Sequence, residues 1–230
     1  MQLLTSNNKL GKSVSGWHIL GLHMLPGISA GVGDLCPQRG ECYQVCLAWA
    51  GHGLRPNVRQ ARKARAVLLF RKPDEFCMRL HIELEDALCT AKDAGCCLAV
   101  RLNVFSDILW SEHSAVYGVL RAWARKGVRF YDYTKHTEEP DRSIYGDSTR
   151  MCYSWSERST AVPSWAEWVS VVGDVVPSGL CRSQFMHWEE LADGDKDDLF
   201  FLRGSGIQML SPKGLARKKG AASGFVSVLP

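Results

Sequence analysis

The fold is decided by the stretch from Leu98 to Thr134, which reads LAVRLNVFSDILWSEHSAVYGVLRAWARKGVRFYDYT. Residues 98–106 and 128–134 are short apolar runs rich in branched and aromatic side chains, which is typical of buried strands. Residues 111–126 between them have a helical pattern that stops at Gly127, where we expect a left-handed cap. A strand, a helix and a second strand in this order predict a parallel pair joined by a crossover helix.

The same alternation continues on both sides of this stretch. Further elements are expected as a helix at 73–92 and strands at 151–156 and 168–174. Residues 199–210, followed by GFVSVL, look like strands without an intervening helix, which indicates an antiparallel edge. We therefore expect a single α/β domain over residues 1–230. Its parallel sheet is expected to be a partial or complete TIM-barrel-like arrangement with a short C-terminal β segment within 199–230.

Composition places the chain among ordinary globular proteins. Hydrophobic residues make up 46% and charged residues 23% of the 230 positions. No apolar run approaches the roughly 18 residues that a membrane span needs. The first residues, MQLLTSNNKLGKS, lack the layout of a secretory signal. The odd number of cysteines, nine, and the neighbouring pair Cys96 and Cys97 favour a reducing compartment. We expect a cytoplasmic protein with no membrane partner.

Three cysteines lie within eleven residues in the segment DLCPQRGECYQVCLAWAGHG, residues 34–53. Cys36, Cys42 and Cys46 could bring three thiolates to one point, which an iron–sulfur cluster requires. A 4Fe-4S cluster held in this way keeps one position open. Zinc is the alternative, because His52 follows Cys46 by six residues and could complete a closed four-ligand site. Three unliganded thiols in a loop are the third reading, and the residues alone leave all three open.

Polar side chains follow the predicted strands where each strand ends. Those that we select are Arg101, Asn103, Asp107, Lys135, Ser154 and Ser156. Ligands of parallel α/β folds bind at the carboxyl ends of the strands, so these side chains could share a pocket. We expect Lys135, Asp107 and Asn103 to be catalytic, and Arg101, Ser154 and Ser156 to bind a cofactor. Each of them singly could also cap a helix or close a turn.

A basic helix is expected over residues 55–72, which contain no acidic residue. Asn57 is a candidate for its N-cap. Its candidate nucleic-acid contacts are Arg55, Arg59, Arg62, Lys63 and Arg65. Such a face could lie along a phosphate backbone, whereas a solvated helix face is the ordinary alternative. A second basic run, residues 213–219, is interpreted as a surface loop.

Several segments together resemble a known family. They are NNKLGKS, the clustered cysteines, RPNVRQAR, VRLNVFSD, VRFYDYTK, YSWSERS and DGDKDDLFFLRGSG. In this order they are similar to the gene-product-88-like proteins of phages and plasmids, and they cover most of the chain. The resemblance implies a phage-encoded protein of the host cytoplasm that is related to radical-SAM barrels.

Kinship with radical-SAM barrels has further implications for the cofactor. It implies S-adenosylmethionine beside the open iron, with Tyr43 packed against it. The cysteine spacing departs from the usual Cys-x3-Cys-x2-Cys, and no Gly-Gly-Glu segment follows the second strand. Two function classes follow. One is an iron–sulfur enzyme that acts on a nucleotide or nucleic acid. The other is a non-catalytic, zinc-stabilised nucleic-acid-binding protein of a phage replication module, with a replication-initiation-type role.

Overall fold

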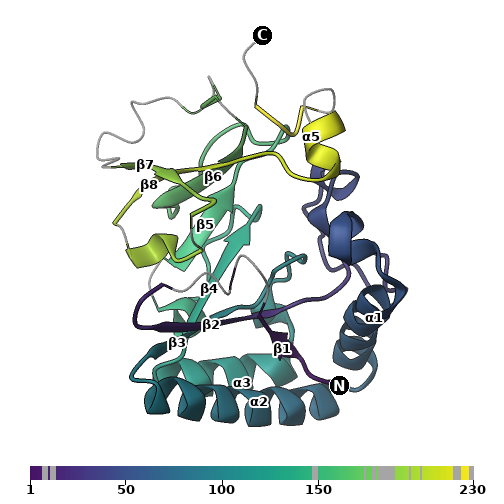
Figure 1. Cartoon of the computed structure of the whole chain (residues 1–230), viewed down its shortest axis with the longest axis vertical. Coiled ribbons are helices and arrows are strands. Elements are labelled where there is room, and N and C mark those ends of the chain that lie inside the picture. Colours follow the sequence, from purple (N-terminus) through teal and green to yellow (C-terminus); the bar gives the residue numbers. More distant parts are fainter. Residues whose placement is uncertain are drawn as a thin grey trace.

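A computed structural model describes most of the chain (Figure 1). The described residues are 1–6, 10, 14–146, 150–173, 175–177, 180, 190–196, 198–202, 204–219 and 224–227. They form an eight-stranded sheet in the order β1-β2-β3-β4-β5-β6-β8-β7. The strands are β1 Leu4–Thr5, β2 Trp17–Leu22, β3 Cys97–Arg101, β4 Arg129–Thr134, β5 Met151–Ser154, β6 Trp168–Val172, β7 Glu190–Asp193 and β8 Gly206–Leu210. All pairs are parallel except β1 with β2.

Helices connect the strands in the first two thirds of the chain. The α-helices are α1 Pro56–Arg71, α2 Pro73–Asp93, α3 Ser114–Arg125, α4 Arg142–Tyr145 and α5 Leu215–Lys219. Three short 3-10 helices precede α1, namely η1 Glu41–Tyr43, η2 Leu47–Trp49 and η3 Gly51–Leu54. In Figure 1, α2 and α3 run side by side across one end of the molecule, and α1 stands beside them. The predicted α/β class with a parallel sheet is confirmed.

The sheet is buried on both faces, because its side chains alternate between two cores. In β4, Phe130 packs with the helices α2 and α3, whereas Tyr131 and Tyr133 face the other way. That second core contains Trp168 and Phe200 from the C-terminal part of the chain. Both groups of side chains are shielded from water, which explains why the strands read as nearly continuous apolar runs.

The individual helices follow their sequence signals closely, with two differences at their starts. The helix predicted at 73–92 is α2, and Gly127 has the expected positive φ, 98°. Asn57 is not the N-cap of α1, because Pro56 occupies the first turn and Arg55 precedes it without a side-chain cap. The helix predicted to begin at Ser111 begins at Ser114, after a short 3-10 turn.

The C-terminal β segment differs from its prediction in direction. β8 is parallel to both β6 and β7, so the expected antiparallel edge there is wrong. The connection from Asp193 to Gly206 is long enough for a parallel crossover, and the element described in it is a 3-10 turn, Phe200–Leu202. The antiparallel strand is instead β1, at the opposite edge. Positions 174, 203, 228 and 229 of the expected strands lie outside the described residues.

Within the described ranges the sheet is open, with β1 and β7 at its two edges. A closed barrel is therefore not formed by this part of the chain. The parallel strands β2 to β6 follow each other in sequence order, so the chain winds in one direction. In a doubly wound sheet the order would reverse at a switch point. Separately, none of the described helices is long and apolar enough to cross a membrane.

Candidate functional site

A cavity of about 900 Å³ lies at the carboxyl ends of the parallel strands. The strand-end residues in its wall are Arg101 of β3, Tyr133 of β4, Ser154 of β5, Val172 of β6 and Leu210 of β8. Residues close to both termini complete the wall, among them Thr5 and Phe225. The cavity therefore occupies the edge of the sheet where parallel α/β proteins bind their ligands.

All three clustered cysteines line this cavity. They lie on the segment of residues 36–46 between β2 and α1, which we call the thiol loop. The sulfur of Cys36 accepts a hydrogen bond from the Gly27 N–H at 3.3 Å and donates one to the Phe105 carbonyl at 3.5 Å. The sulfur of Cys46 accepts a hydrogen bond from the Ala48 N–H. Backbone N–H groups that point at sulfur are a feature of iron–sulfur sites.

The electrostatics of the thiols are set by burial and by one lysine. Burial raises the pKa of Cys36 to about 12 and also raises the pKa of Cys46, because a thiolate loses its hydration there. Lys135, which follows β4, reaches the same point and forms a hydrogen bond with Cys42. Burial acts to lower the pKa of Lys135, but the negative charge available on Cys42, Asp107 and Cys36 outweighs it and raises this pKa.

Asp107 joins the thiol loop to the sheet. Its Oδ1 accepts a hydrogen bond from the Thr134 hydroxyl at 2.7 Å, and its Oδ2 accepts one from the Lys135 N–H at 3.0 Å. Its own N–H donates to the carbonyl of Leu35, one residue before Cys36, at 2.7 Å. Asp107 lines the cavity, but its carboxylate is occupied in fixing the end of β4 beside the cysteines. It therefore positions Lys135 against the thiols.

The side chain of Asn103 is likewise occupied by hydrogen bonds within the fold. Its Oδ1 accepts hydrogen bonds from the Ser106 hydroxyl and the Ile108 N–H, at 2.8 and 3.1 Å. Its Nδ2 donates to the Ile108 carbonyl and to Asp132. Asn103 belongs to the cavity wall but is only 3% exposed, and its hydrogen bonds shape the loop after β3. The catalytic role expected for Asn103 finds no free polar atom in this arrangement.

A buried polar network lies below the cavity, on the inner face of the sheet. Arg101 forms an ion pair with the fully buried Asp198 at 3.1 Å, and its guanidinium lies 4.3 Å from the ring centre of Tyr133. The hydroxyls of Tyr131 and Tyr133 donate to Asp198 at 3.0 and 3.1 Å. The same Tyr133 hydroxyl lies 2.8 Å from Oε1 of Gln208, so its single proton is available to either acceptor. Arg101 is thus neutralised by a partner that lies almost a hundred positions further along the chain.

Of the other expected cofactor contacts, two line the cavity and one does not. Ser154 lines the cavity, and its hydroxyl lies 3.1 Å from that of Ser170. Ser156 does not belong to the wall, since its hydroxyl accepts a hydrogen bond from the Arg158 N–H in the following turn. Tyr43 lines the cavity within the thiol loop, and its hydroxyl lies 2.8 Å from that of Ser29. Ser156 therefore closes a turn, which was the alternative considered for it.

The five basic residues of α1 do not form a single exposed face. Arg55, Arg59 and Lys63 are exposed, whereas Arg62 and Arg65 are buried and line the cavity. Arg65 donates to the backbone carbonyls of Gln2 and His23, at 2.8 and 3.2 Å. Arg62 lies 4.3 Å from the ring centre of Phe105 and donates to a carbonyl before α1. The expectation that Arg62 and Arg65 lie on an exposed nucleic-acid face is corrected by their burial.

Sequence reasoning missed the inward position of two residues of the wall and assigned no role to a third. Arg62 and Arg65 were expected to contact nucleic acid, and the phase of α1 buries them instead. His23, at the end of β2, lies beside them, and burial lowers the pKa of this imidazole to about 4, with the nearby arginines adding to the effect. A signal was present, since Arg62, Arg65 and Leu69 are spaced by three and four residues like a buried stripe.

The donor set fits a three-thiolate cluster in its chemistry. Three cysteines line one cavity, two of their sulfurs accept backbone hydrogen bonds, and the partly buried ammonium of Lys135 contacts the third. Among the described residues, however, no three His, Cys, Asp or Glu side chains are already arranged around one metal position. His52 also lines the cavity. The thiol loop thus has the right donors in an arrangement that is wider than a bound metal requires.

The fold and the site together define an α/β protein with an open, singly wound parallel sheet and a three-thiol cavity at its carboxyl edge. The family model described as Gene product 88 matches residues 1–228. The chain belongs to this family. No curated protein and no solved structure matches the chain.

Proposed function

We propose that the thiol loop binds an iron–sulfur cluster of the 4Fe-4S type through Cys36, Cys42 and Cys46. The observation that carries this proposal is that all three thiols line one cavity, next to Lys135. Held by three thiolates, such a cluster would supply an iron with an open coordination position for ligand binding, and it could transfer electrons. Its binding would require the three sulfurs to come together, because they are not arranged around one metal position among the described residues.

The protein is proposed to be an enzyme on a partial barrel. The order of β2 to β6 along the sheet is that of consecutive barrel strands, and the cavity lies where barrel enzymes hold their substrates. In this arrangement Lys135 offsets the charge of the thiolates. Asp107 and Asn103 hold Lys135 and the loop after β3 in place. S-adenosylmethionine is the cofactor to test first, because the kinship with radical-SAM barrels implies it.

Charge around the cavity supports an anionic substrate such as a nucleotide or a nucleic acid. Six cationic side chains line the cavity, against the two carboxylates Asp107 and Asp195. Three of the cations have carboxylate partners, namely Arg39 with Asp34, Arg101 with Asp198 and Lys213 with Asp195. Within the described residues the other three, Arg62, Arg65 and Lys135, have no ion pair. Arginine is well suited to phosphate recognition.

Metal analysis of anaerobically prepared protein tests this function. We expect a brown protein with about four iron and four sulfide per chain, the content of a 4Fe-4S cluster. The triple variant Cys36→Ala, Cys42→Ala, Cys46→Ala should lose both. The matched control is Cys77→Ala, Cys89→Ala, Cys97→Ala, which removes three thiols that do not line the cavity and should keep the cluster. Iron retained by the first variant would sink the proposal.

The second candidate function is a zinc-stabilised nucleic-acid-binding protein without catalysis. It is favoured by one observation, that His52 lines the same cavity as the three cysteines. A colourless protein with one zinc per chain would support it over the cluster. In that case His52→Ala should lower the zinc affinity, because closed structural sites use four protein ligands. With an iron–sulfur cluster on three cysteines, the same variant should leave the iron content unchanged.

A further inference from the structure

Exposed cations from two distant parts of the chain meet beside the cavity. One group lies on the first half of α1, and the other forms most of α5. We call them together the basic rim, made up of Arg55, Arg59, Lys63, Arg217, Lys218 and Lys219. All six side chains are exposed, and more than 150 sequence positions separate the two groups. The second group, expected from sequence to lie in a surface loop, belongs to the helix α5.

A continuous chain of packed elements joins the two groups. α5 packs against η2, η2 packs against η3, and η3 packs against α1. The contact of α5 is close, since a Cβ added to Gly214 would lie 2.6 Å from the Cβ of Ala50. On the other side, the guanidinium of Arg59 lies 5.7 Å from the ring centre of Trp49 in η2. The two groups therefore belong to one surface of the protein.

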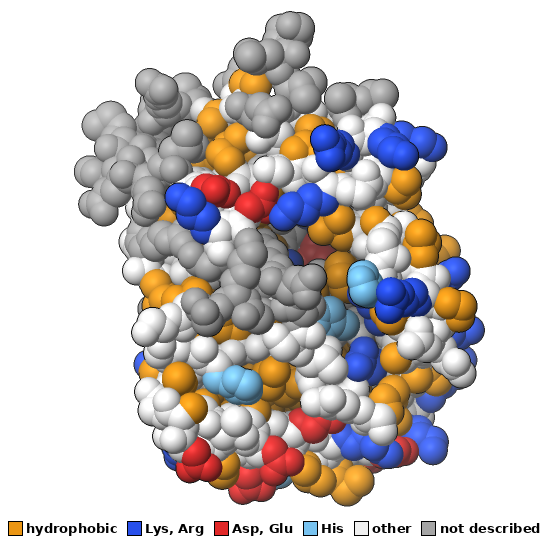
Figure 2. All heavy atoms as spheres, in the orientation of Figure 1, with side chains coloured by type: hydrophobic (Ala, Val, Ile, Leu, Met, Phe, Trp, Pro, Cys, Tyr) orange, Lys and Arg blue, Asp and Glu red, His pale blue; other side chains and the backbone are white. Residues whose placement is uncertain are grey.

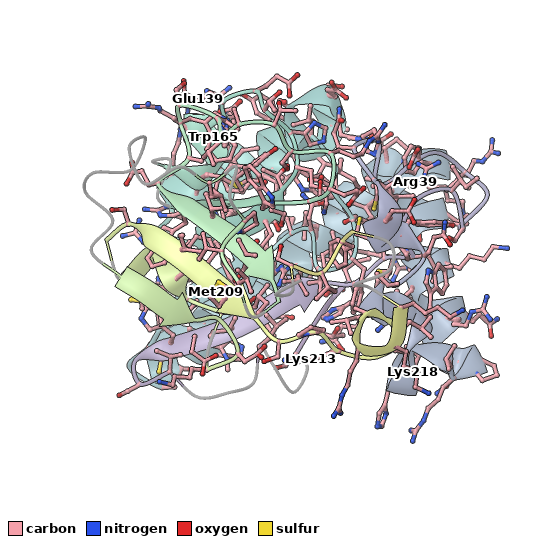
Figure 3. The ribbon with its side chains drawn as sticks, turned by 90° about the horizontal axis from the view of Figure 1, so that it is seen from above. Arg39, Glu139, Trp165, Met209, Lys213 and Lys218 are labelled. Atoms are coloured by element: carbon pink, nitrogen blue, oxygen red, sulfur yellow. The ribbon has the colours of Figure 1, made fainter. Side chains whose placement is uncertain are left out.

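This surface borders the opening of the cavity. Val58 and Ala61 of α1, Leu47 of η2, and Lys213 and Ala216 at the α5 end all line the cavity. Ala216 is buried and faces inward, whereas the three residues after it are exposed. Figure 3 shows Lys213 and Lys218 at this end, on the same side of the molecule as α1. The rim thus presents its charges outward while its own helices form part of the cavity wall.

The charge of the rim is not neutralised by neighbouring acids. Neither residues 55–72 nor residues 211–219 contain an Asp or Glu. No ion pair to any of the six rim side chains occurs within the described part of the chain. In Figure 2 blue side chains lie over α5 and along the side formed by α1, whereas a group of acidic side chains lies at the end covered by α2. A row of unpaired cations beside a cavity favours an extended polyanion as the ligand.

We infer that the basic rim binds the phosphate backbone of a nucleic-acid strand and holds that strand across the mouth of the three-thiol cavity. The inference deepens the proposed function and rests on it for the chemistry that follows binding, because it makes the substrate a polynucleotide rather than a free nucleotide. The rim supplies contacts to several successive phosphates, while Arg62, Arg65 and Lys135 remain for the one nucleotide at the cavity.

A charge-reversal experiment tests the rim. The variant is Arg217→Glu, Lys218→Glu, Lys219→Glu, and the probe is a labelled single-stranded DNA of about 20 nucleotides, longer than the site of one typical binding domain. We expect at least a roughly tenfold loss of affinity. The slope of log K against log salt concentration should be smaller in magnitude by about 2, since each phosphate contact on a single strand contributes about 0.7. A free mononucleotide should compete only weakly.

A matched control variant carries three charge reversals near the amino ends of the strands, opposite to the cavity. Lys92, Arg125 and Arg129 lie near the ends of α2 and α3 and at the start of β4, and all three are exposed. The variant Lys92→Glu, Arg125→Glu, Arg129→Glu has the same net charge and should bind DNA within about twofold of the wild type. Equal losses in both variants would overturn the inference, because binding would then follow net charge alone.

Two further measurements distinguish DNA from other polyanions and test the inference independently of the proposed cluster. Phosphatidylserine vesicles or polyglutamate bound through the rim, with no DNA binding, would overturn the inference in favour of a membrane or an acidic protein. The Cys36→Ala, Cys42→Ala, Cys46→Ala variant should still bind DNA, since the rim contains none of these residues. DNA binding by a protein without any iron would support the inference and reject the proposed function. Iron in a protein that does not bind DNA would support the proposed function and overturn the inference.

Discussion

Asp132 is a fully buried carboxyl group in β4, on the side of the sheet opposite to the tyrosine network. It accepts hydrogen bonds from the Asn103 N–H at 2.6 Å, from the Asn103 side chain at 3.2 Å and from the Tyr145 hydroxyl at 3.1 Å. Burial raises its pKa to about 8, although the charge of Arg101 and these hydrogen bonds act in the opposite direction. A proton is thus held inside the fold, next to the loop that carries Asn103 and Asp107.

The raised pKa of Asp132 predicts that the protein loses stability between pH 6.5 and 8. In this range the folded state holds a proton on Asp132 that the unfolded state, with a pKa near 3.9, has released. The free energy of unfolding should therefore fall as pH rises, by up to about 1.4 kcal/mol per pH unit. Below pH 6.5 the lowered pKa of His23 has the opposite effect on stability. The unfolded imidazole binds a proton in this range that the folded imidazole does not bind.

Urea unfolding at several pH values checks this prediction. The comparison is with Asp132→Asn, which cannot titrate and should show a flatter dependence from pH 6.5 to 8. Between pH 4 and 6.5 the contributions of Asp132 and His23 oppose each other, so the stability of His23→Gln should fall with rising pH in this range, whereas that of the wild type should stay nearly constant. If the wild type and Asp132→Asn have the same slope above pH 6.5, the proton is not held on Asp132.

At the scale of elements, α2 has the most regular division between a buried and an exposed face. Its buried residues are Phe76, Leu80, Leu84, Ala87 and Ala91, spaced by three and four positions. This face packs against the sheet and α3. On the outer face, Ile82 is 50% exposed. Leu84 and Ile82 are therefore two large aliphatic side chains on the same helix, of which the first is buried and the second is half exposed.

Leu84→Ala is predicted to lower the free energy of unfolding by about 2–5 kcal/mol, because it leaves a cavity between helix and sheet. Ile82→Ala, two residues away, should change it by no more than about 0.5 kcal/mol, since the side chain is half exposed and alanine favours the helix. Urea unfolding of both variants gives the comparison. Similar losses in the two variants would mean that α2 does not pack on the sheet through this face.

The elements that sequence predicted well are those whose signals are local. The acidic first turn and the apolar stripe of α2 predicted its extent to within one residue, and Gly127 predicted the end of α3. The extent of α1 was predicted to within one residue at each end, but the direction of its arginines was not. Its inner face carries Arg62 and Arg65, and their spacing was not interpreted as a buried stripe because arginine is mostly exposed in proteins.

For the whole molecule, sequence predicted the parallel α/β architecture and the gathering of polar residues at the strand ends. Of the six selected residues all but Ser156 line one cavity with the three cysteines, namely Arg101, Asn103, Asp107, Lys135 and Ser154. The direction of β8 and the openness of the sheet could not be predicted, because both depend on pairing between segments distant in sequence. The same holds for the pairing of Arg101 with Asp198, since no local pattern links two residues almost a hundred positions apart.

Removal of the proposed cluster is predicted to loosen one region and leave the rest of the protein folded. The thiol loop contacts a small separate core in which Val45 packs with Ala216 and Val226. The main core, which holds α2 and α3 on the sheet, does not include the three cysteines. After chelation, amide hydrogen exchange should rise in residues 36–50 and 215–227 and stay unchanged in α2. Global unfolding on chelation would instead indicate a structural metal, as in a zinc-dependent domain.

The cavity wall runs from Thr5 to Phe225, and this has a consequence for how the protein is made. On the ribosome, β2 to β6 can pair while the rest of the chain is still being synthesised, because each strand joins the one before it. The thiol loop emerges early, but the small core that backs it is completed only when Val226 has left the exit tunnel. Delivery of the proposed cluster to the finished pocket would therefore follow translation.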